Sequence, residues 1–340
     1  MSYNKHIAID AMGGDNGMQV TVPASLKVLK EFPDLHLHLV GDKPQMQTLL
    51  GDLPVGVAER LQLLHAEETI SAEEKPANVL RSGQGSSMFL AASLVKSGTV
   101  QAMVSAGNTG ALIMIGRHLL KTINGIDKPA LVATIPGAFS QAYLLDVGAN
   151  VDCSAEQLFQ FGAMGSVLAE SLAPGHRARV GLLNIGVEDY KGSDQVKRAA
   201  KMLESCKALD YVGFVEANAL FEGLADVVVC DGFVGNVTIK TSAGVANVVN
   251  TILSDQIAEN WFNRIAGLLL KPLLRKIRRQ TSPHRFNGAS LLGLQGSIIK
   301  SHGNTNVDGF AFAIQQAINE VENAVPQLIS KRVEEIIQAN

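Results

Sequence analysis

The sequence is short of cysteine and of long apolar runs, and these shortages exclude several classes of protein. Its three cysteines, Cys153, Cys206 and Cys230, are far apart and lie among apolar residues. This pattern is typical of reduced, buried thiols rather than of disulfides. No segment has the roughly 20 apolar residues needed to span a bilayer, and the amino terminus lacks the cationic and apolar regions of a signal peptide. We therefore expect a cytoplasmic protein.

Sequence motifs for metals and nucleotides are missing as well. The chain has no HExxH, no cluster of cysteine and histidine and no Walker lysine motif, so we expect no metal and no cofactor. It also has no GxGxxG motif with a partner acid, the combination that binds a dinucleotide. These absences weigh against a nicotinamide-dependent enzyme.

Acidic residues are absent from one long stretch. Residues 260–307 contain no Asp or Glu and carry eight Lys or Arg residues, whereas the whole chain has a net charge of −3. A cationic stretch in an otherwise acidic chain predicts a surface that faces an anionic partner. Nucleic acid is the least favoured partner, because few aromatic residues interleave with the cations.

What is present is a repeated alternation of short apolar runs and helical patterns. The chain opens with an expected strand at 6–10, a glycine loop, a helix at 19–31 and a strand at 35–40. Further strands are expected at 101–105, 130–135, 142–146, 179–184, 211–215 and 226–230. The alternation predicts a three-layer α/β/α fold with a mostly parallel sheet. We expect one unit of two lobes over residues 1–340, from which an amphipathic basic segment at 253–283 protrudes.

The loops after strands are candidate sites, because the helices that follow present unpaired N–H groups and a partial positive charge. VSAGNTGALI has a strand, a small-residue turn at Gly107, and Asn108 or Thr109 as the cap of an apolar helix. DAMGGD ends the first strand with three candidates, Asp10, Gly13 and Gly14. Both loops would suit an oxyanion, and both are also explained as tight turns.

Two later loops carry charged candidates. In LLNIGVEDYKG a strand ends at Asn184, and a glycine-bounded loop carries Lys191, which can pair with an anion. In VVVCDGFVGN an apolar strand leads into Asp231 and then into a helix with Asn236 and Lys240. A carboxylate in that position is either a helix cap or a functional acid.

A fifth segment, residues 285–306, is rich in Gly, Ser and Asn, and we expect it to form a polar, backbone-rich lining. It supplies Asn287, Lys300 and His302. For His302, a loop histidine bonded to nearby backbone is as good an interpretation as a catalytic one. His36 and His38 alternate with leucine and are interpreted as the polar face of a strand.

These strings occur together in one known family. DAMGGD, SSM at 86–88, VSAGNTGAL, DVGANVDC, LLNIG with KG, VVVCDGFVGN, NGASLLGL and KSHG follow the order seen in the PlsX phosphate acyltransferases. The chain resembles that family over almost its whole length, and chance agreement of so many long strings is very improbable.

The resemblance implies that the chain converts acyl-acyl carrier protein and inorganic phosphate to acyl phosphate and free carrier protein, without a cofactor, for phospholipid synthesis. It implies a fold similar to that of the isocitrate and isopropylmalate dehydrogenases and of phosphotransacetylase. It also implies a homodimer, peripheral association with the inner face of the cytoplasmic membrane, and a membrane glycerol-3-phosphate acyltransferase as the next enzyme. The chain departs from the family pattern at Ala217 and Ala219, where a Gly and an acid are expected, so no role is carried over to those positions.

The chemistry of acyl transfer to phosphate matches the residues of these loops. Phosphate is largely dianionic at neutral pH and a thiolate leaves readily, so no strong base is needed. The requirement is to hold the anion against the thioester carbonyl and to donate hydrogen bonds to the oxyanion that forms. We predict direct attack by phosphate held by Lys191 and the amides after Gly107, with Asp231 or His302 managing the proton of the thiol. The alternative is an acyl-enzyme intermediate on Cys230.

The basic segment has two interpretations. Between Ile257 and Leu269 the apolar side chains fall on one arc of a helix. The segment is either a helix packed on the body or on a partner subunit, or a surface for anionic lipid or the acidic carrier protein. Releasing a long acyl chain beside lipid avoids a cost of about 0.8 kcal/mol per methylene, which favours the second. The residues expected there are Trp261, Phe262, Arg264, Leu268, Lys271, Arg275, Lys276, Arg278 and Arg279.

Two other functions stay open. A nicotinamide-dependent hydroxy-acid dehydrogenase of similar fold would bind a dinucleotide. A non-catalytic membrane scaffold would depend on Trp261 and Arg275 rather than on Lys191 and Asp231.

Overall fold

The computed structural model describes residues 4–137, 141–259, 261, 263, 265, 270–272 and 287–338. Its elements over the first part of the chain are β1 (Lys5–Asp10), α1 (Met18–Glu31), β2 (Leu35–Gly41), α2 (Lys43–Leu50), α3 (Val55–Ala58), β3 (Leu61–His65), α4 (Val79–Ser82), α5 (Ser87–Lys96), β4 (Ala102–Ser105), α6 (Thr109–Leu120), β5 (Ala130–Pro136) and β6 (Gln141–Leu145). The rest are α7 (Ala155–Leu172), β7 (Arg179–Leu183), α8 (Asp194–Ser205), β8 (Asp210–Val215), the 3₁₀ helix η1 (Ala217–Phe221), β9 (Val227–Val229), α9 (Gly232–Ala258), β10 (Ala289–Leu292), β11 (Ser297–Lys300), α12 (Val307–Glu322) and α13 (Val325–Gln338).

The strands form one mixed sheet in the order β3-β2-β1-β4-β11-β10-β5-β6-β9-β7-β8. The pairings of β10 with β11, of β10 with β5 and of β5 with β6 are antiparallel. The other neighbours pair in parallel. The predicted α/β fold with a mostly parallel sheet is therefore confirmed.

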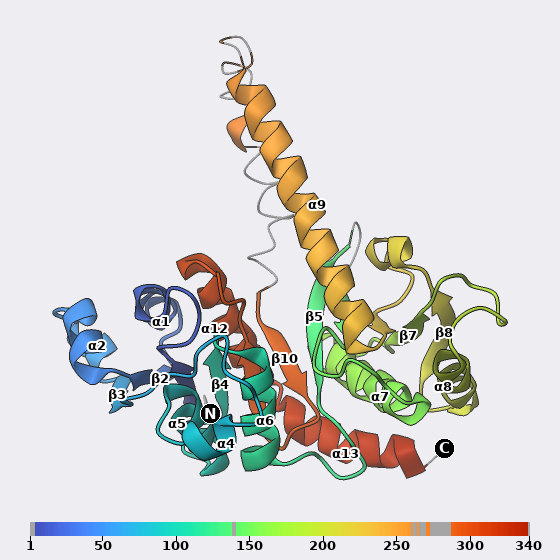
Figure 1. Ribbon diagram of the computed structural model, residues 1–340, viewed down its shortest axis with the longest axis horizontal. Coiled ribbons are helices and arrows are strands. Elements are labelled where there is room, and N and C mark those ends of the chain that lie inside the picture. The colour runs from blue at the N-terminus through green and yellow to red at the C-terminus, as the bar shows by residue number, and fades with distance from the viewer. Residues whose placement is uncertain are drawn as a thin grey trace.

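The antiparallel pairings reverse the strand direction across the middle of the sheet. β1, β4 and β11 run one way, and because three antiparallel pairings separate β11 from β6, the strands β6, β9 and β7 run the other way. The loops that follow the first three strands and those that follow the second three therefore leave the sheet at opposite edges. In Figure 1, β1 to β4 with their helices occupy one side of the molecule, and β7 and β8 occupy the other.

Helices cover both faces of the sheet, as the alternation of side chains along the strands requires. On β5, Val132 packs into a core built largely by α7 and α13, while Leu131 points to the opposite face and packs with α5 and α6. On β1, Ile7 and Ile9 meet α1 and α12, and Ala8 between them meets α5 and α6. The result is three layers, helix, sheet and helix.

One helix departs from this layering. α9 has 27 residues, of which only Gly232 and Gly235 are buried, and it projects away from the body of the molecule (Figure 1). At about 1.5 Å per residue it is about 40 Å long. The helix thus begins at Gly232, with its first turn buried against the body, whereas the protruding segment was expected to begin at residue 253. The large apolar side chains exposed on α9 include Val237, Val245, Val248, Val249, Ile252 and Leu253. Among the helices described, none is both long and apolar enough to cross a membrane.

The sequence patterns located most strands within one or two residues but missed three. β3 was not expected, and β10 and β11 lie inside the segment interpreted as a polar lining, where Ser290 precedes two leucines and Ser297 precedes two isoleucines on buried strands. On β2, His36 and His38 share one face, where the ring of His6 stacks on His36 at 4.6 Å and lies 3.2 Å, Nδ1 to Nε2, from the buried His38. Its side chain is only 4% exposed, and burial, with His6 and His36 nearby, lowers its pKa to about 4.

Candidate functional site

Asp10, at the end of β1, ties four pieces of the chain together. Its Oδ1 accepts a hydrogen bond of 2.6 Å from Ser87 Oγ in the first turn of α5, and its Oδ2 accepts one of 2.6 Å from Ser105 Oγ at the end of β4. The backbone N–H groups of Met12 and Gly13 also donate to it. Complete burial raises the pKa of the Asp10 carboxyl, and these donors oppose the rise. The carboxylate therefore fixes the first glycine turn against α5 and β4.

Lys300 brings a largely buried positive charge to the same place. It ends β11 and pairs in register with Ser105 of β4, and its Nζ donates to the carbonyls of Ala106, at 3.4 Å, and Ser301. Burial lowers the pKa of Lys300 to about 8, while the nearby charges of Asp10 and Asp15 oppose the fall. A lysine ammonium has three N–H donors, and two of them go to carbonyls that the loops themselves supply.

The loop after β11 is held by Asn287. Its Nδ2 lies 2.8 Å from Ser301 Oγ, 3.1 Å from Thr305 Oγ1 and 2.8 Å from the carbonyl of Gly309, and its Oδ1 accepts from the N–H of His302 at 2.9 Å. This loop is polar, as expected, but the side chain of Asn287 bonds within the loop and holds it in place. The side chain of His302 is exposed.

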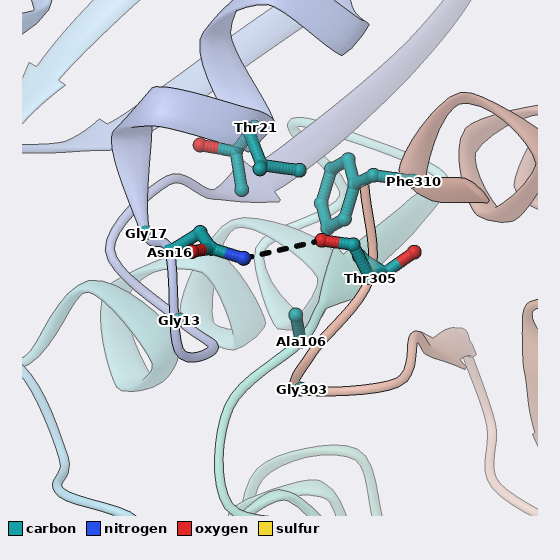
Figure 2. Close-up of a pocket in the computed structure, with 9 residues that line it drawn as sticks. Gly13, Asn16, Gly17, Thr21, Ala106, Gly303, Thr305 and Phe310 are labelled. Atoms are coloured by element: carbon teal, nitrogen blue, oxygen red, sulfur yellow. Dashed lines mark hydrogen bonds between the residues drawn. The ribbon is translucent and has the colours of Figure 1, made fainter. Parts of the chain in front are cut away.

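The three turns after β1, β4 and β11 meet at a narrow recess, shown in Figure 2. Asn16 Nδ2 donates to the carbonyl of Thr305 at 3.4 Å across it, and Asp15 N donates to the carbonyl of Gly303 at 2.9 Å. The residues that line it are Gly13, Asn16, Gly17, Val20, Thr21, Ala106, Gly303, Thr305 and Phe310.

Close approach explains why glycines occur at these turns. A Cβ on Gly13 would lie 2.5 Å from Asp10 Oδ2 and 2.8 Å from the N of Gly107. Gly14 has φ of +88°, and its Cβ would lie 2.9 Å from the carbonyl oxygen of Gly303. Gly107 has its own N–H bonded to Ser105 Oγ at 3.0 Å, so that amide already has a partner within the loop.

Asn108 is the cap of α6, as expected for one of the two candidates. Its Oδ1 accepts from Ala111 N at 3.1 Å, and its Nδ2 lies within hydrogen-bond distance of the carbonyls of Ser71, Ala72 and Glu74. The side chain therefore starts the helix and holds a preceding loop over it. The first-turn position next to it, Thr109, is half-buried.

A second group of buried polar side chains forms where β6 ends. Asp146 is fully buried, and its Oδ1 accepts from the N–H groups of Leu131, Gly148 and Ala149 at 2.9 to 3.2 Å. Its Oδ2 accepts from Asn150 N at 2.7 Å and Asn150 Nδ2 at 2.9 Å. Burial raises the pKa of Asp146, and these donors oppose the rise. The carboxylate shapes the loop that leads to α7.

Asp231 lies beside this loop and is the cap of α9. Its Oδ1 accepts from Val234 N at 2.8 Å, so the helix-cap interpretation describes its contact. The N–H of Gly232 donates to the carbonyl of Asn150 at 2.7 Å, and Asn236, half-buried, lies near Gly148. Lys240 is exposed about one turn beyond Asn236 on α9.

Lys191, in the loop after β7, already has an anionic partner. Its Nζ lies 2.8 Å from Glu188 Oε2 in the same loop, and Asn184 Nδ2 donates to its carbonyl at 3.2 Å. Ser193 caps α8 directly afterwards. The loop therefore folds Lys191 onto its own carboxylate.

The structure thus separates residues that we expected to hold one phosphate. Gly107 follows β4 and Lys191 follows β7, six strand spacings away in a strand of opposite direction, and at about 4.8 Å per spacing this is about 29 Å along the sheet. A lysine side chain cannot bridge that distance, so the predicted pairing of Lys191 with the amides after Gly107 is wrong. Asp231 follows β9, four spacings from β11, the strand that His302 follows, so these two residues are likewise apart.

Most of the expected lipid or carrier surface lies outside the described residues, namely Phe262, Arg264, Leu268, Arg275, Lys276, Arg278 and Arg279. Of the remaining two, Trp261 is 72% exposed and Lys271 is exposed. In the described parts of the chain, no group of three His, Cys, Asp or Glu side chains is arranged to hold a metal ion.

Sequence reasoning missed the residues that organise the two groups. Ser87, Ser105 and Asp146 stand inside the strings SSM, VSAGNTGAL and DVGANVDC, which carried the resemblance. A small hydroxyl residue beside a strand-end aspartate gives no signal in sequence, because the partner is 77 or 95 positions away.

The fold and site define an α/β protein in which strand-end loops gather amides, a buried lysine and asparagines, a combination suited to small anions. The family model described as "Fatty acid synthesis protein" matches residues 5–328. A phosphate acyltransferase of Pseudomonas putida (strain F1) is 50% identical over 331 residues, covering 97% of this chain and 98% of the relative. A phosphate acyltransferase of Legionella pneumophila (strain Paris) is 46% identical over 334 residues, covering 98% of each. The chain belongs to this family, the PlsX phosphate acyltransferases of fatty acid and phospholipid synthesis, and is an acyltransferase.

Solved structures agree on the fold. A phosphotransacetylase from Streptococcus pyogenes superposes with a TM-score of 0.59 at 16% identity, covering 96% of this chain and 94% of that one. A 4-hydroxythreonine-4-phosphate dehydrogenase from Klebsiella pneumoniae gives a TM-score of 0.53 at 14% identity, covering 95% and 99%. The expected likeness to phosphotransacetylase is confirmed at the level of fold.

Proposed function

We propose that the chain transfers the acyl group of acyl-acyl carrier protein directly to inorganic phosphate and releases acyl phosphate and free carrier protein. Membership of the phosphate acyltransferases supports the reaction type. The carrier-protein thioester is the substrate that provides both an activated acyl group and the acidic partner expected for a basic surface. The alternatives of a dehydrogenase and of a non-catalytic scaffold are set aside, since the relatives are acyltransferases.

The observation that carries direct attack is the state of the thiols. Cys230 is 4% exposed, its Sγ donates to the carbonyl of Asp146 at 3.5 Å, and burial raises its pKa well above the ordinary value. Burial, with Asp146 and Asp231 nearby, raises the pKa of Cys153 to about 12, and Cys206 is buried. Only the thiolate is a good nucleophile. None of the three is therefore suited to carry an acyl-enzyme intermediate.

Phosphate fits best at the first group of residues, around Lys300. In the described residues Lys300 forms no salt bridge, whereas Lys191 is neutralised by Glu188. The turns at Gly13, Gly107 and Gly303 and the amino terminus of α6 meet beside it. A phosphate there would receive the ammonium and the helix amino terminus, both of which favour an anion.

The reaction needs one bond made and one broken. A phosphate oxygen attacks the thioester carbonyl and forms the new C–O bond, which gives a tetrahedral oxyanion. The oxyanion then collapses, the carbonyl is restored, and the C–S bond breaks to release the carrier-protein thiolate. Of the two candidates for the proton of the departing thiol, His302 follows Lys300 by two residues, whereas Asp231 caps a helix in the other group. We therefore assign that proton to His302.

The remaining partners are proposed on the same basis. A homodimer and a peripheral position on the inner face of the cytoplasmic membrane agree with the exposed apolar side chains of α9 and with Trp261. Delivery of acyl phosphate at a membrane would supply the glycerol-3-phosphate acyltransferase that follows.

The test is to supply the purified chain with acyl-acyl carrier protein with and without phosphate. Free thiol is titrated, and acyl phosphate is trapped with hydroxylamine. We expect both products in equal amounts and only with phosphate; thiol release independent of phosphate would refute the function. Lys300→Met should lower turnover at least about a hundredfold, and the matched Lys191→Met should stay within about twofold of the wild type.

A further inference from the structure

Two serines stand at the centre of the first group without having been assigned a role. Ser87 Oγ and Ser105 Oγ each lie 2.6 Å from a different oxygen of Asp10. Both serines are at most 1% exposed, and so is Asp10. Hydrogen bonds from hydroxyl groups to an ionised carboxylate are among the stronger ones in proteins, so the two serines hold Asp10 in one orientation.

Asp10 in turn acts on Lys300. The two residues lie on β1 and β11, which flank β4 on either side, and the charge of Asp10 opposes the fall in the pKa of Lys300 that burial causes. The other acid whose charge acts on Lys300 is Asp15, which is exposed in the turn after β1. Without a fixed, ionised Asp10, a largely buried lysine would lose its proton more easily.

Ser105 makes a second connection. While its hydroxyl donates to Asp10, the same oxygen accepts the N–H of Gly107 at 3.0 Å. It thereby couples the carboxylate to the turn that begins α6, the helix whose amino terminus faces the proposed anion. A chain of hydrogen bonds thus runs from Ser87 through Asp10 and Ser105 to Gly107, and it ends beside Lys300.

We propose that Ser87 and Ser105 are positioning residues for phosphate: by holding both oxygens of Asp10 they keep Lys300 charged and the Gly107 turn in the geometry that receives the anion. This inference rests on the proposed function. It differs from a purely structural role, which would affect stability but would leave the phosphate dependence and the pH dependence of the reaction unchanged.

The experiment measures steady-state kinetics of Ser87→Ala and Ser105→Ala as a function of phosphate and of pH, with folding checked by circular dichroism. We expect the KM for phosphate to rise about tenfold, as for the loss of one charge-assisted hydrogen bond, with the KM for acyl-acyl carrier protein within about twofold. The alkaline limb of the pH profile should move to lower pH. Ser93→Ala, which removes a hydroxyl on α5 that donates to the Phe89 carbonyl, should match the wild type.

Two further readings make the test decisive. Wild-type protein that makes no acyl phosphate would refute the proposed function, whereas active wild type with folded serine variants of unchanged phosphate KM and unchanged pH profile would refute this inference alone. If the alanine variants do not fold, Asp10→Asn takes their place. An alkaline limb that moves to lower pH in this variant supports the inference, and an alkaline limb at the wild-type pH overturns it. In Lys300→Arg the alkaline limb of the pH profile should disappear, because an arginine side chain does not titrate in this range.

Discussion

Gly235 lies so close to Asp146 that a Cβ at position 235 would stand 1.8 Å from the Asp146 carbonyl oxygen. The contact brings the first turn of α9 against the loop that follows β6. Cys230 Sγ would lie 3.0 Å from the same Cβ. No flexible side chain can give way there, because the obstructing atom belongs to the backbone. The position of the projecting helix on the body thus depends on a glycine.

Gly235→Ala should destabilise the protein by about 3 kcal/mol or more, since backbone must move to admit the methyl group. The matched control is Gly244→Ala in the same helix, where a Cβ meets nothing within 4 Å. That change should stabilise by up to about 1 kcal/mol, because alanine is the better helix former. Urea unfolding of the three proteins measures both, and equal effects of the two substitutions would refute the close packing at Gly235.

Glu320 should make stability fall as pH rises. It is 2% exposed on α12, and burial raises the pKa of its carboxyl from 4.5 to about 7, against the opposing effect of Ser290, Ser297 and Gln316. Because the carboxyl has a higher pKa in the folded than in the unfolded protein, its protonation stabilises the fold fully below pH 4.5. This stabilisation is lost by pH 7, which lowers the free energy of unfolding by on the order of 3 kcal/mol.

Glu320→Gln should remove this part of the pH dependence. As the pH rises from 5 to 8, we expect the free energy of unfolding of the variant to increase relative to that of the wild type. Urea unfolding at pH 5 and at pH 8 measures this difference. Glu335→Gln, an exposed glutamate of α13, serves as the control and should follow the wild type. Parallel curves for all three proteins would contradict a titrating buried carboxyl.

Asp231 should prove to be a helix cap rather than a catalytic acid. Asp231→Ala should lose about 1 kcal/mol of stability, while Asp231→Asn should lose little, because asparagine caps nearly as well. Both variants should turn over substrate within about threefold of the wild type, since the cap supports structure alone. A folded Asp231→Asn protein with turnover reduced a hundredfold would return Asp231 to the reaction.

Trp261 should contribute to membrane association without contributing to turnover. Trp261→Ala should sediment several-fold less with anionic phospholipid vesicles, because an interfacial aromatic side chain is lost, and should keep its activity on soluble substrate. Val55→Ala removes an equally exposed apolar side chain, 72% in both cases, on the distant α3. Equal sedimentation of the two variants would place the lipid contact elsewhere.

The sequence predicted strands better than it predicted their directions. Apolar runs ending in Gly, Asp or Asn located β1, β4, β7 and β9, since burial on both faces makes such runs continuous. Nothing in those runs shows that β10, β5 and β6 reverse the direction of the sheet, because direction depends on pairings between residues far apart in the chain. That reversal is why Lys191 and Gly107 are separated.

The candidate site was predicted in part for the same reason. Local signals identified Asn108 as a cap, because a helix cap depends on neighbours in sequence. Lys300 was named as a candidate, but the strand that it ends, β11, was not expected. The serines that bind Asp10 carry no local signal. Asp231 was recognised as either cap or acid, and only its bond to Val234 N separates the two.

The most direct test of the account is the intact mass of the protein after incubation with acyl-acyl carrier protein in the absence of phosphate. Direct attack by phosphate predicts an unchanged mass and no released thiol until phosphate is added. A mass increase of one acyl group on the protein, lost when phosphate is supplied, would contradict it.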